Sequence, residues 1–309
     1  MVRSFARNQL SYLIILSGCV LFPSVATGGD PPVTERNIYV KTGANPQGAN
    51  GVQWSTAFPN LRLGLSAAAT ATETFIYIRV AAGTYRPSAS GVQSTSFVLP
   101  PRTTIFGGYE GISGTPGTRD LVNFSTTLSG DLAQDDIQTP EVIASTLDDN
   151  SYHVVYANDR QLDAGLDGLV IAGGYAFGDT TPYACMPASC ANFNTISSPG
   201  GAGLLAIDCT ILVRDCVFRH NRAERGGAIR LMCGAPTILH CRFEENSATD
   251  VTNVTVNPEV GSQLLVMMNE GNGGAIWAVG CCAAKIEGCA FYRNLSGHVG
   301  GAVAVQVRD

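Results

Sequence analysis

The chain has 309 residues, of which 45% are hydrophobic and only 14% are charged, with 35 glycines and 15 prolines. This profile favours a stacked β structure with many turns over a helical one. The formal net charge of −6 and the lack of any basic run argue against a nucleic-acid partner. After the N-terminal segment, no apolar run reaches the ~18 residues that a membrane span needs.

The N-terminal segment is typical of an export signal. MVRSFARNQ carries two arginines and no acid, and the apolar LSYLIILSGCVLFPSVA that follows ends in small residues. Residues 1–26 are therefore predicted to be a signal peptide cleaved after Ala26. The alternative is a lipoprotein signal ending before Cys19, because Leu16-Ser17-Gly18-Cys19 resembles a bacterial lipobox. Lipid on Cys19 would then be the chain's only membrane contact.

Residues 27–165 are predicted to form an N-terminal cap and the first, irregular coils of a β structure. Short β-rich runs such as TFIYIRVAAGTY (74–85), TTIFGGY (103–109) and YHVVY (152–156) alternate with turns. The segment 56–70, TAFPNLRLGLSAAAT, is predicted to be the single helix. We expect it to cover the open end of the stack, since an exposed coil edge is a template for aggregation.

Residues 166–309 contain a repeated pattern of nearly constant spacing, in which only one segment varies in length. This is typical of a solenoid. Gly-Gly-Ala occurs at 200–202, 226–228, 273–275 and 300–302, and it includes the pairs Gly226/Gly227 and Gly273/Gly274. Cys-x-Phe-x-x-Asn occurs as Cys216/Phe218/Asn221, Cys241/Phe243/Asn246 and Cys289/Phe291/Asn294. An upstream coil, LDGLVIAGGYA (166–176), aligns Ile171 with the Phe column and Gly174 with the Asn column.

Successive residues of a strand point to opposite faces, so the alternation of apolar residues within a repeat predicts which side chains face the core and which face outward. Ile229, Leu231 and Cys233 are predicted to point inward, and so are Leu205 and Ile207 one coil earlier. Arg230 and Trp277 fall on the opposite face, where they can meet solvent. The alternation breaks at Asp215, His240 and Gly288, which predicts a corner. Each repeat is therefore one coil of a parallel β-helix, with a core stack of Phe, an amide ladder of Asn and glycine pairs at a tight corner.

Two insertions leave the stack at the same corner, 177–199 after Ala176 and 249–272 after Ala248. Insertions gathered on one edge of a repeat protein are often binding loops, although neutral loop growth explains them as well. The pattern breaks off at Asp309, after the first strand of a further coil. We interpret this as the end of a truncated product or of a fragment of a longer surface protein.

The cysteines, histidines and acids give no clear metal or cofactor site, so none is predicted. Outside the cytoplasm disulfides are plausible, and Cys185 and Cys190 are candidates for a local bridge. The repeat cysteines fit a core column as well as bridges, and no cysteine and histidine spacing fits zinc. Asp131, Asp135 and Asp136 could gather calcium, but a solvated turn is the expected arrangement.

Catalysis on a parallel β-helix needs carboxylates with Arg or Lys one coil apart on an outer face. The face that carries Arg230 and Trp277 shows no acidic pair. No catalytic residue is therefore predicted, and Arg230 and Trp277 remain candidates for contacts with a sugar ligand.

The repeats resemble those of the polymorphic outer membrane protein family, first described in chlamydial surface proteins. The resemblance rests on Gly-Gly-Ala-Ile at 226–229 and 273–276 and on Phe-x-x-Asn at 218–221, 243–246 and 291–294. The first half is similar to secreted proteins of the pectin-lyase type in IYVKTGA, VAAGTYRP, IFGGYEG and TLSGD. The resemblance implies an all-β, right-handed parallel β-helix with a short N-terminal helical cap, located at the cell surface.

Two functions follow as hypotheses. The first is an exported, non-catalytic β-helix, extracellular or associated with the outer membrane, that serves structure, adhesion or recognition. Its expected partners are a surface polysaccharide or another cell-surface protein. The second is a β-helix that binds or cleaves carbohydrate, in the manner of polysaccharide lyases and hydrolases. Carboxylates clustered on the face of Arg230 and Trp277 would favour the second hypothesis.

Overall fold

The computed structural model describes residues 33–114, 116–136, 146–158, 163–177, 179, 200–248, 272–280, 283–297 and 300–306. Cys19, Cys185, Cys190 and almost all of both predicted insertions lie outside the described residues. The compact unit that carries the fold spans Val33–Asp309. Among the helices that the described ranges contain, none is long and apolar enough to cross a bilayer.

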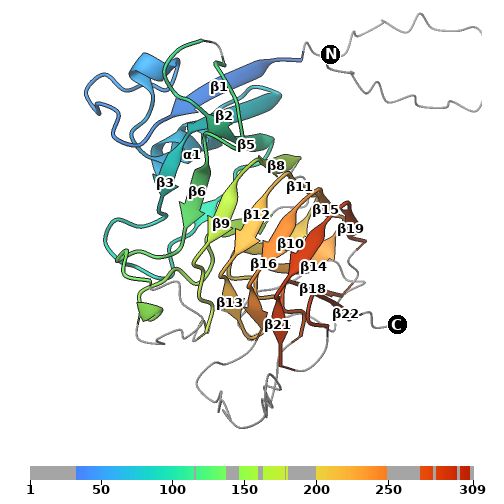
Figure 1. Cartoon of the computed structure of the whole chain (residues 1–309). Helices are drawn as coiled ribbons and strands as arrows, with labels where there is room; N and C mark the ends of the chain where they lie inside the picture. Colours follow the sequence, from blue (N-terminus) through green and yellow to red (C-terminus); the bar gives the residue numbers. More distant parts are fainter. Residues whose placement is uncertain are drawn as a thin grey trace, which may run out of the picture. The chain divides into compact units, whose positions relative to one another are not determined.

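The chain winds into an all-β parallel β-helix, which confirms the predicted fold class. Its strands form four sheets, and every strand pair within them is parallel. Strands of successive coils lie side by side in chain order (Figure 1). Because neighbours in each sheet come from consecutive coils, backbone hydrogen bonds between coils hold the stack together.

Three long sheets form the walls and a fourth, short sheet occupies one corner. Sheet A contains β1 (Glu35–Val40), β2 (Phe75–Ala81), β5 (Thr103–Tyr109), β8 (Ala164–Asp167), β11 (Ile211–Arg214), β15 (Thr237–Leu239) and β19 (Lys285–Glu287). Sheet B contains β3 (Gly83–Tyr85), β6 (Thr126–Ser129), β9 (Val170–Ala172), β12 (Val217–Arg219), β16 (Arg242–Glu244) and β20 (Ala290–Tyr292). Sheet C contains β4 (Phe97–Val98), β7 (Val155–Asn158), β10 (Leu204–Cys209), β14 (Ile229–Gly234), β18 (Ile276–Val279) and β22 (Val303–Gln306). Sheet D contains β13 (Arg222–Ala223), β17 (Ser247–Ala248) and β21 (Leu295–Ser296).

The corner between sheets A and B lies where the alternation of the sequence breaks. Asp215, His240 and Gly288 have φ angles of 52°, 52° and 64°, and Gly168 occupies the same corner one coil earlier with a φ of 66°. A single residue in the left-handed region reverses the parity of the side chains, so the residues on both sides of it can point inward. The corner was therefore predictable from the odd spacing alone.

The core is a set of columns that run from coil to coil. Phe218, Phe243 and Phe291 stack with centroid separations of 5.2 and 5.0 Å and interplanar angles of 10°. Ile171 continues this column one coil earlier, paired with Phe218. Offset stacking of this kind adds about 0.5–1.5 kcal/mol per aromatic pair to the free energy of burial.

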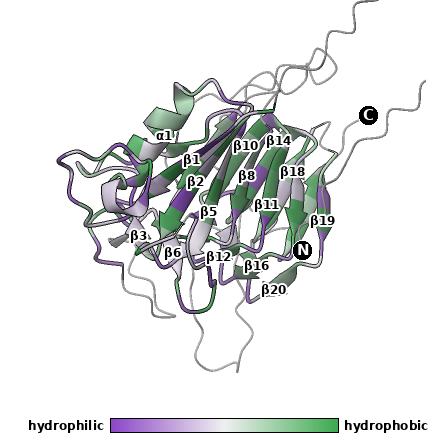
Figure 2. Cartoon of the chain, turned by 90° about the horizontal axis from the view of Figure 1, so that it is seen from above, coloured by the Kyte–Doolittle hydropathy of each residue, from purple (hydrophilic) through white to green (hydrophobic). Residues whose placement is uncertain are grey.

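A helix packs against the first strands of sheet A. The helix α1 (Leu61–Ala69) is shorter than the predicted segment 56–70, and the single turn η1 (Trp54–Thr56) precedes it. Asn60 fixes its start, because its side chain accepts a hydrogen bond from the Leu63 amide. Leu61 and Leu65 join the main core, and α1 lies against β1 and β2 as expected for a cap (Figure 2).

The first Gly-Gly-Ala motif is offset by one residue from its predicted register. Gly200 pairs with Arg225 rather than with Gly226. Gly201 therefore takes the corner position of Gly226, and its φ is 72° where that of Gly226 is 60°. The sequence of two adjacent glycines does not reveal a one-residue shift in register, because either glycine can adopt the left-handed conformation.

This offset corrects the predicted inner face of β10. Leu204 pairs with Ile229 and points into the core, whereas Leu205 and Ile207 lie on the outer face of sheet C. Cys233 was also predicted to point inward, but its φ of 60° turns it toward the outer cluster. A one-residue slip in a strand exchanges every inward and outward side chain.

Candidate functional site

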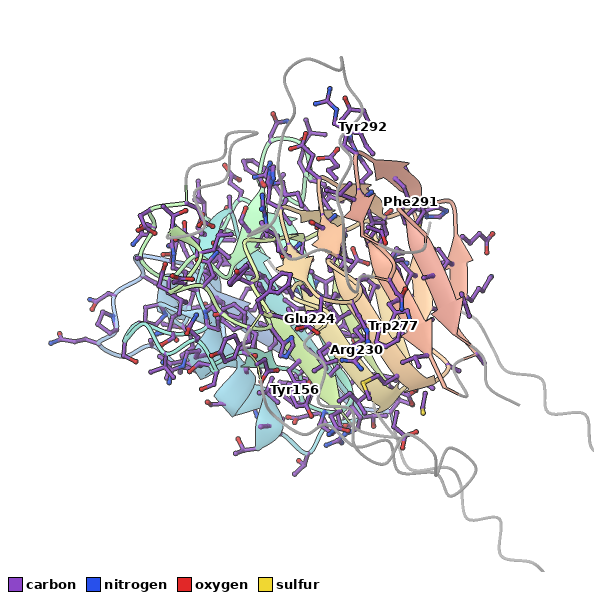
Figure 3. All side chains as sticks on the ribbon, turned by 90° about the horizontal axis from the view of Figure 1, so that it is seen from below. Tyr156, Glu224, Arg230, Trp277, Phe291 and Tyr292 are labelled. Carbon is purple, nitrogen blue, oxygen red and sulfur yellow. The ribbon has the colours of Figure 1, made fainter. Side chains whose placement is uncertain are left out.

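The predicted ligand face around Arg230 and Trp277 is buried, so the prediction that it meets solvent was wrong. Arg230 is 0% exposed and Trp277 is 3% exposed. The guanidinium carbon of Arg230 lies 4.6 Å from the centroid of the Trp277 ring, and that of Arg225 lies 5.2 Å from it. Figure 3 shows Arg230 and Trp277 side by side, with Tyr156 nearby.

The burial follows from the neighbours of this pair on sheet C. Leu205, Met232 and Val279 pack with Trp277 in an apolar cluster on the outer face. Alternation shows on which side of a strand a residue lies, but it does not show whether that side is covered. We therefore assign the pair a packing role through cation–π contact rather than a role in binding ligand.

The asparagine column is a continuous amide ladder. Asn221 Nδ2 donates to Asn246 Oδ1 over 3.0 Å, and Asn246 Nδ2 donates to Asn294 Oδ1 over 2.9 Å. Each amide also donates to the carbonyl oxygen of the Phe-column residue one coil earlier, at 2.8–3.0 Å. The backbone N–H of Gly174 donates to Asn221 Oδ1 at the upstream end. These residues hold coils together and face the interior, so they are structural.

The first glycine of each complete pair makes the predicted tight corner. Gly226 and Gly273 have φ angles of 60° and 66°, in the left-handed region that favours glycine. A Cβ on either would also overlap the carbonyl oxygen of the residue three positions later. Both conformation and space therefore require glycine at this position.

The second glycine of each pair fits the other reason expected for glycine at this corner, which is that a side chain would clash. Gly227 and Gly274 do not have a positive φ, so neither takes part in the left-handed turn. They are needed for space instead. A Cβ on Gly227 would overlap the carbonyl oxygens of Gly274 and Ser247, and one on Gly274 would overlap those of Gly301 and Leu295. Their role is thus the close approach of backbone between neighbouring coils.

The repeat cysteines also serve the stack. Cys216, Cys241 and Cys289 are free thiols, and Cys216 and Cys241 are buried. Burial raises the pKa of the Cys216 thiol well above its ordinary value. These three thiols thus form a packing column.

A polar pocket lies on the outer face of sheet B. It has a volume of about 280 Å³ and is lined by Arg219, His220, Arg242, Glu244, Glu245 and Tyr292. Three coils contribute to it, because β12, β16 and β20 are neighbours in sheet B. Tyr292 is 55% exposed, so its ring offers an open apolar surface at the rim. In Figure 3 Tyr292 lies away from Arg230 and Trp277.

The two residues between Phe and Asn of each repeat supply most of this pocket. Arg219, Glu244 and Tyr292 align in one column on the outward side of sheet B. The next residue in each coil, His220, Glu245 or Arg293, has a φ of 50–54° and therefore projects at the corner. A left-handed residue at the same place in three coils groups their side chains at one edge.

The charges of the pocket are balanced by ion pairs. Arg242 pairs with Glu244, and Arg293 Nη1 lies 3.5 Å from Glu245 Oε1. His220 Nδ1 lies 3.6 Å from Glu245 Oε2. Partial burial lowers the pKa of His220, and Glu245 offsets part of that shift. The lowered pKa favours the neutral form of the imidazole.

Arg219 lines the pocket, and among the described residues its buried Nε atom has no hydrogen-bond partner. A buried N–H without an acceptor costs about 1–3 kcal/mol. The guanidinium of Arg293 lies over the Tyr292 ring at 4.9 Å and holds the ring at the rim. The pocket thus combines the apolar face of the Tyr292 ring with hydrogen-bond donors and acceptors.

Sequence reasoning missed this pocket, although a signal for it was present. Outward columns were compared only for the first strand of each repeat, where Arg230 and Trp277 lie. The same comparison for the two variable positions of Phe-x-x-Asn gives Arg-His, Glu-Glu and Tyr-Arg in successive coils. Such a run of charged and aromatic residues stacked one coil apart is the pattern expected of a binding face.

Comparisons with known protein families, with curated proteins and with solved structures found no match.

Proposed function

We propose that this chain is an exported, non-catalytic β-helix module that binds a neutral carbohydrate in the pocket on sheet B. The observation that carries the proposal is the exposed ring of Tyr292 beside the charged groups of Arg219, Arg242, Glu244 and Glu245. The expected partner is a surface polysaccharide, and the leader sequence supports export by way of the bacterial envelope.

The chemistry of a sugar matches these groups. A pyranose ring has an apolar face of C–H groups that can pack on an aromatic ring, as the Tyr292 side chain allows. Its hydroxyls both donate and accept hydrogen bonds, so they can use guanidinium donors and carboxylate acceptors together. The pocket volume of about 280 Å³ is near the lower end of small-ligand sites, which suits a short segment of a glycan chain.

The charge balance favours a neutral sugar over an acidic one. Two arginines and two glutamates line the pocket, so their formal charges cancel, and the lowered pKa of His220 favours its neutral form. Polyanion binding would favour an excess of basic side chains, which these residues do not supply. A guanidinium such as that of Arg219 requires only an acceptor, which a hydroxyl provides.

Binding without cleavage is proposed because both carboxylates of the pocket are engaged. Hydrolysis of a glycosidic bond normally uses one carboxyl group as acid and a second as base or nucleophile. Here Glu244 is paired with Arg242, and Glu245 is shared between His220 and Arg293. Each carboxylate is therefore already held by a basic side chain.

The test is a glycan array of neutral and acidic bacterial oligosaccharides, followed by calorimetry on the best neutral ligand. Tyr292→Ala removes the apolar ring face and should weaken binding about tenfold, which corresponds to about 1.4 kcal/mol. Arg219→Ala should weaken it by a similar factor. Phe75→Ala is the matched control, because it removes an aromatic ring that is 39% exposed in β2, outside the pocket.

Retention of neutral glycans, with weaker binding by Tyr292→Ala and unchanged binding by Phe75→Ala, would support the proposal. An array that retains only acidic glycans, or none, would overturn it, and so would equal binding by Tyr292→Ala. Release of reducing ends from the bound oligosaccharide would show that cleavage had been wrongly excluded.

A further inference from the structure

A group of carboxylates lies in the turn that follows β6. One oxygen from each of Asp131, Asp135 and Asp136 lies within 4.8 Å of the others. The sequence predicts a solvated turn here, but only Asp135 is exposed, and Asp131 and Asp136 are half-buried. Burial and the charges of Asp131, Asp149 and Asp135 raise the pKa of Asp136 to about 6, against the opposing effect of a hydrogen bond from Asn150.

The spacing matches the coordination sphere of a large, hard cation. Ca²⁺ binds oxygen ligands at about 2.3–2.6 Å, so ligands on opposite sides of the ion lie up to about 5 Å apart. Mg²⁺ binds at about 2.0–2.1 Å and would need a tighter group. Separations of no more than 4.8 Å between the three carboxylate oxygens lie within the coordination sphere of Ca²⁺.

A second observation points to a missing ligand at this place. Asn150 is 0% exposed, and its Oδ1 atom has no hydrogen-bond partner within the part of the chain that the structure describes. Its amide lies against the cluster, since Nδ2 donates to Asp136 Oδ2 over 2.9 Å. Oδ1 of Asp136 is likewise buried and without a partner. Two buried acceptor oxygens on touching side chains each lose their hydrogen bonds to water, and a cation bound by both would offset that loss.

The next coil lies close to the cluster. Gly173 of the next coil lies over the cluster, and a Cβ there would come within 3.4 Å of Asp136 Oδ2 and 3.2 Å of the Asp131 amide nitrogen. Two basic side chains lie nearby. Arg86 Nε donates to the carbonyl oxygen of Asp131. Burial lowers the pKa of Arg222, and the charges of Tyr175 and Asp136 oppose that shift.

We propose that this turn is a Ca²⁺ site built from the carboxylates of Asp131, Asp135 and Asp136 and the amide oxygen of Asn150. The ion would join the turn after β6 to the segment that carries Asn150. It is distinct from the carbohydrate pocket, to which none of these residues contributes. A result that overturns one of the two proposals therefore leaves the other unaffected.

The test is calorimetric titration of the full chain, stripped with chelator, with CaCl₂ and separately with MgCl₂. We expect one equivalent of Ca²⁺ to bind more tightly than Mg²⁺ and to raise the melting temperature, since an ion that binds only the folded state stabilises it. Asp136→Asn should weaken Ca²⁺ binding by about tenfold or more. Asp163→Asn is the matched control, because Asp163 is an exposed carboxylate outside the cluster.

Absence of heat and of any melting shift up to about 10 mM Ca²⁺, beyond the range of extracellular calcium modules, would overturn the proposal. Equal Ca²⁺ affinity in Asp136→Asn and the wild type would also overturn it, and so would an equal loss in Asp163→Asn. If circular dichroism shows that Asp136→Asn is unfolded, Asp135→Asn takes its place, because that exposed side chain can be changed without disturbing the core.

Discussion

Replacing Asn246 by alanine tests whether the amide ladder holds the coils together. Asn246 is 0% exposed and makes four hydrogen bonds through its side chain. Its Oδ1 accepts from the backbone N–H and from Nδ2 of Asn221, while its Nδ2 donates to Phe218 O and Asn294 Oδ1. Alanine removes all four bonds and leaves the buried N–H of Asn221 without its acceptor.

The expected cost follows from these groups. An orphaned buried N–H costs about 1–3 kcal/mol, and each further bond lost contributes about 0.5–1.5 kcal/mol. Asn246→Ala should therefore lower the free energy of unfolding by about 2.5–7.5 kcal/mol. Asn294 has a similar set of partners but is only half-buried, so water can replace what it loses. Asn294→Ala should cost about 1 kcal/mol.

The assay is equilibrium unfolding in urea, with the midpoint and the slope measured for wild type and both variants. A lower midpoint at an unchanged slope reports lost stability rather than a change in the unfolded state. Equal losses in Asn246→Ala and Asn294→Ala, or a loss below about 1 kcal/mol in Asn246→Ala, would show that the ladder is not a major source of stability.

The remaining predictions concern the corner glycine and the acidic turn. Gly226→Ala should destabilise the fold by about 2–4 kcal/mol, because its φ is 60° and a Cβ would overlap the carbonyl oxygen of Ile229. Gly43→Ala should cost only about 1 kcal/mol, because Gly43 shares the left-handed φ but has open space around it; similar urea midpoints for the two variants would contradict this. In calcium-free buffer, the raised pKa of Asp136 (about 6, against 3.8 unfolded) gives stability that is full below pH 3.8 and is lost as the pH rises through 6. Asp136→Asn should thus gain on wild type between about pH 4.5 and 7.5, and a urea midpoint difference that stays constant over that range would contradict this reasoning.

Much of the architecture could be predicted because successive repeats have the same residue type at the same position. Phe243 and Asn246 recur with their equivalents at almost constant spacing, and a residue that repeats once per coil must stack on its copies. The odd step before Cys241 likewise predicted the corner that His240 makes. These are properties of spacing, and spacing is visible in a sequence.

Other features depend on what lies next to a residue in space. The register of the coil that contains Gly200 and Gly201 could not be predicted, since either glycine is able to adopt a positive φ. The burial of Arg230 was missed because it depends on apolar neighbours across sheet C, which the alternation of one strand does not reveal. The burial around Asp136 could not be predicted, because the buried oxygen of Asn150 comes from a separate segment.

The asparagine ladder also has a direction. In every coil Oδ1 faces the preceding coil, where a backbone N–H from Gly174, Asn221 or Asn246 points at it. A backbone N–H can only donate, so no amide in the ladder can turn over without setting two donors against each other. The amide dipoles are therefore aligned along the stack and polarise one another. Each coil therefore fixes both the position and the orientation of the asparagine side chain in the next coil.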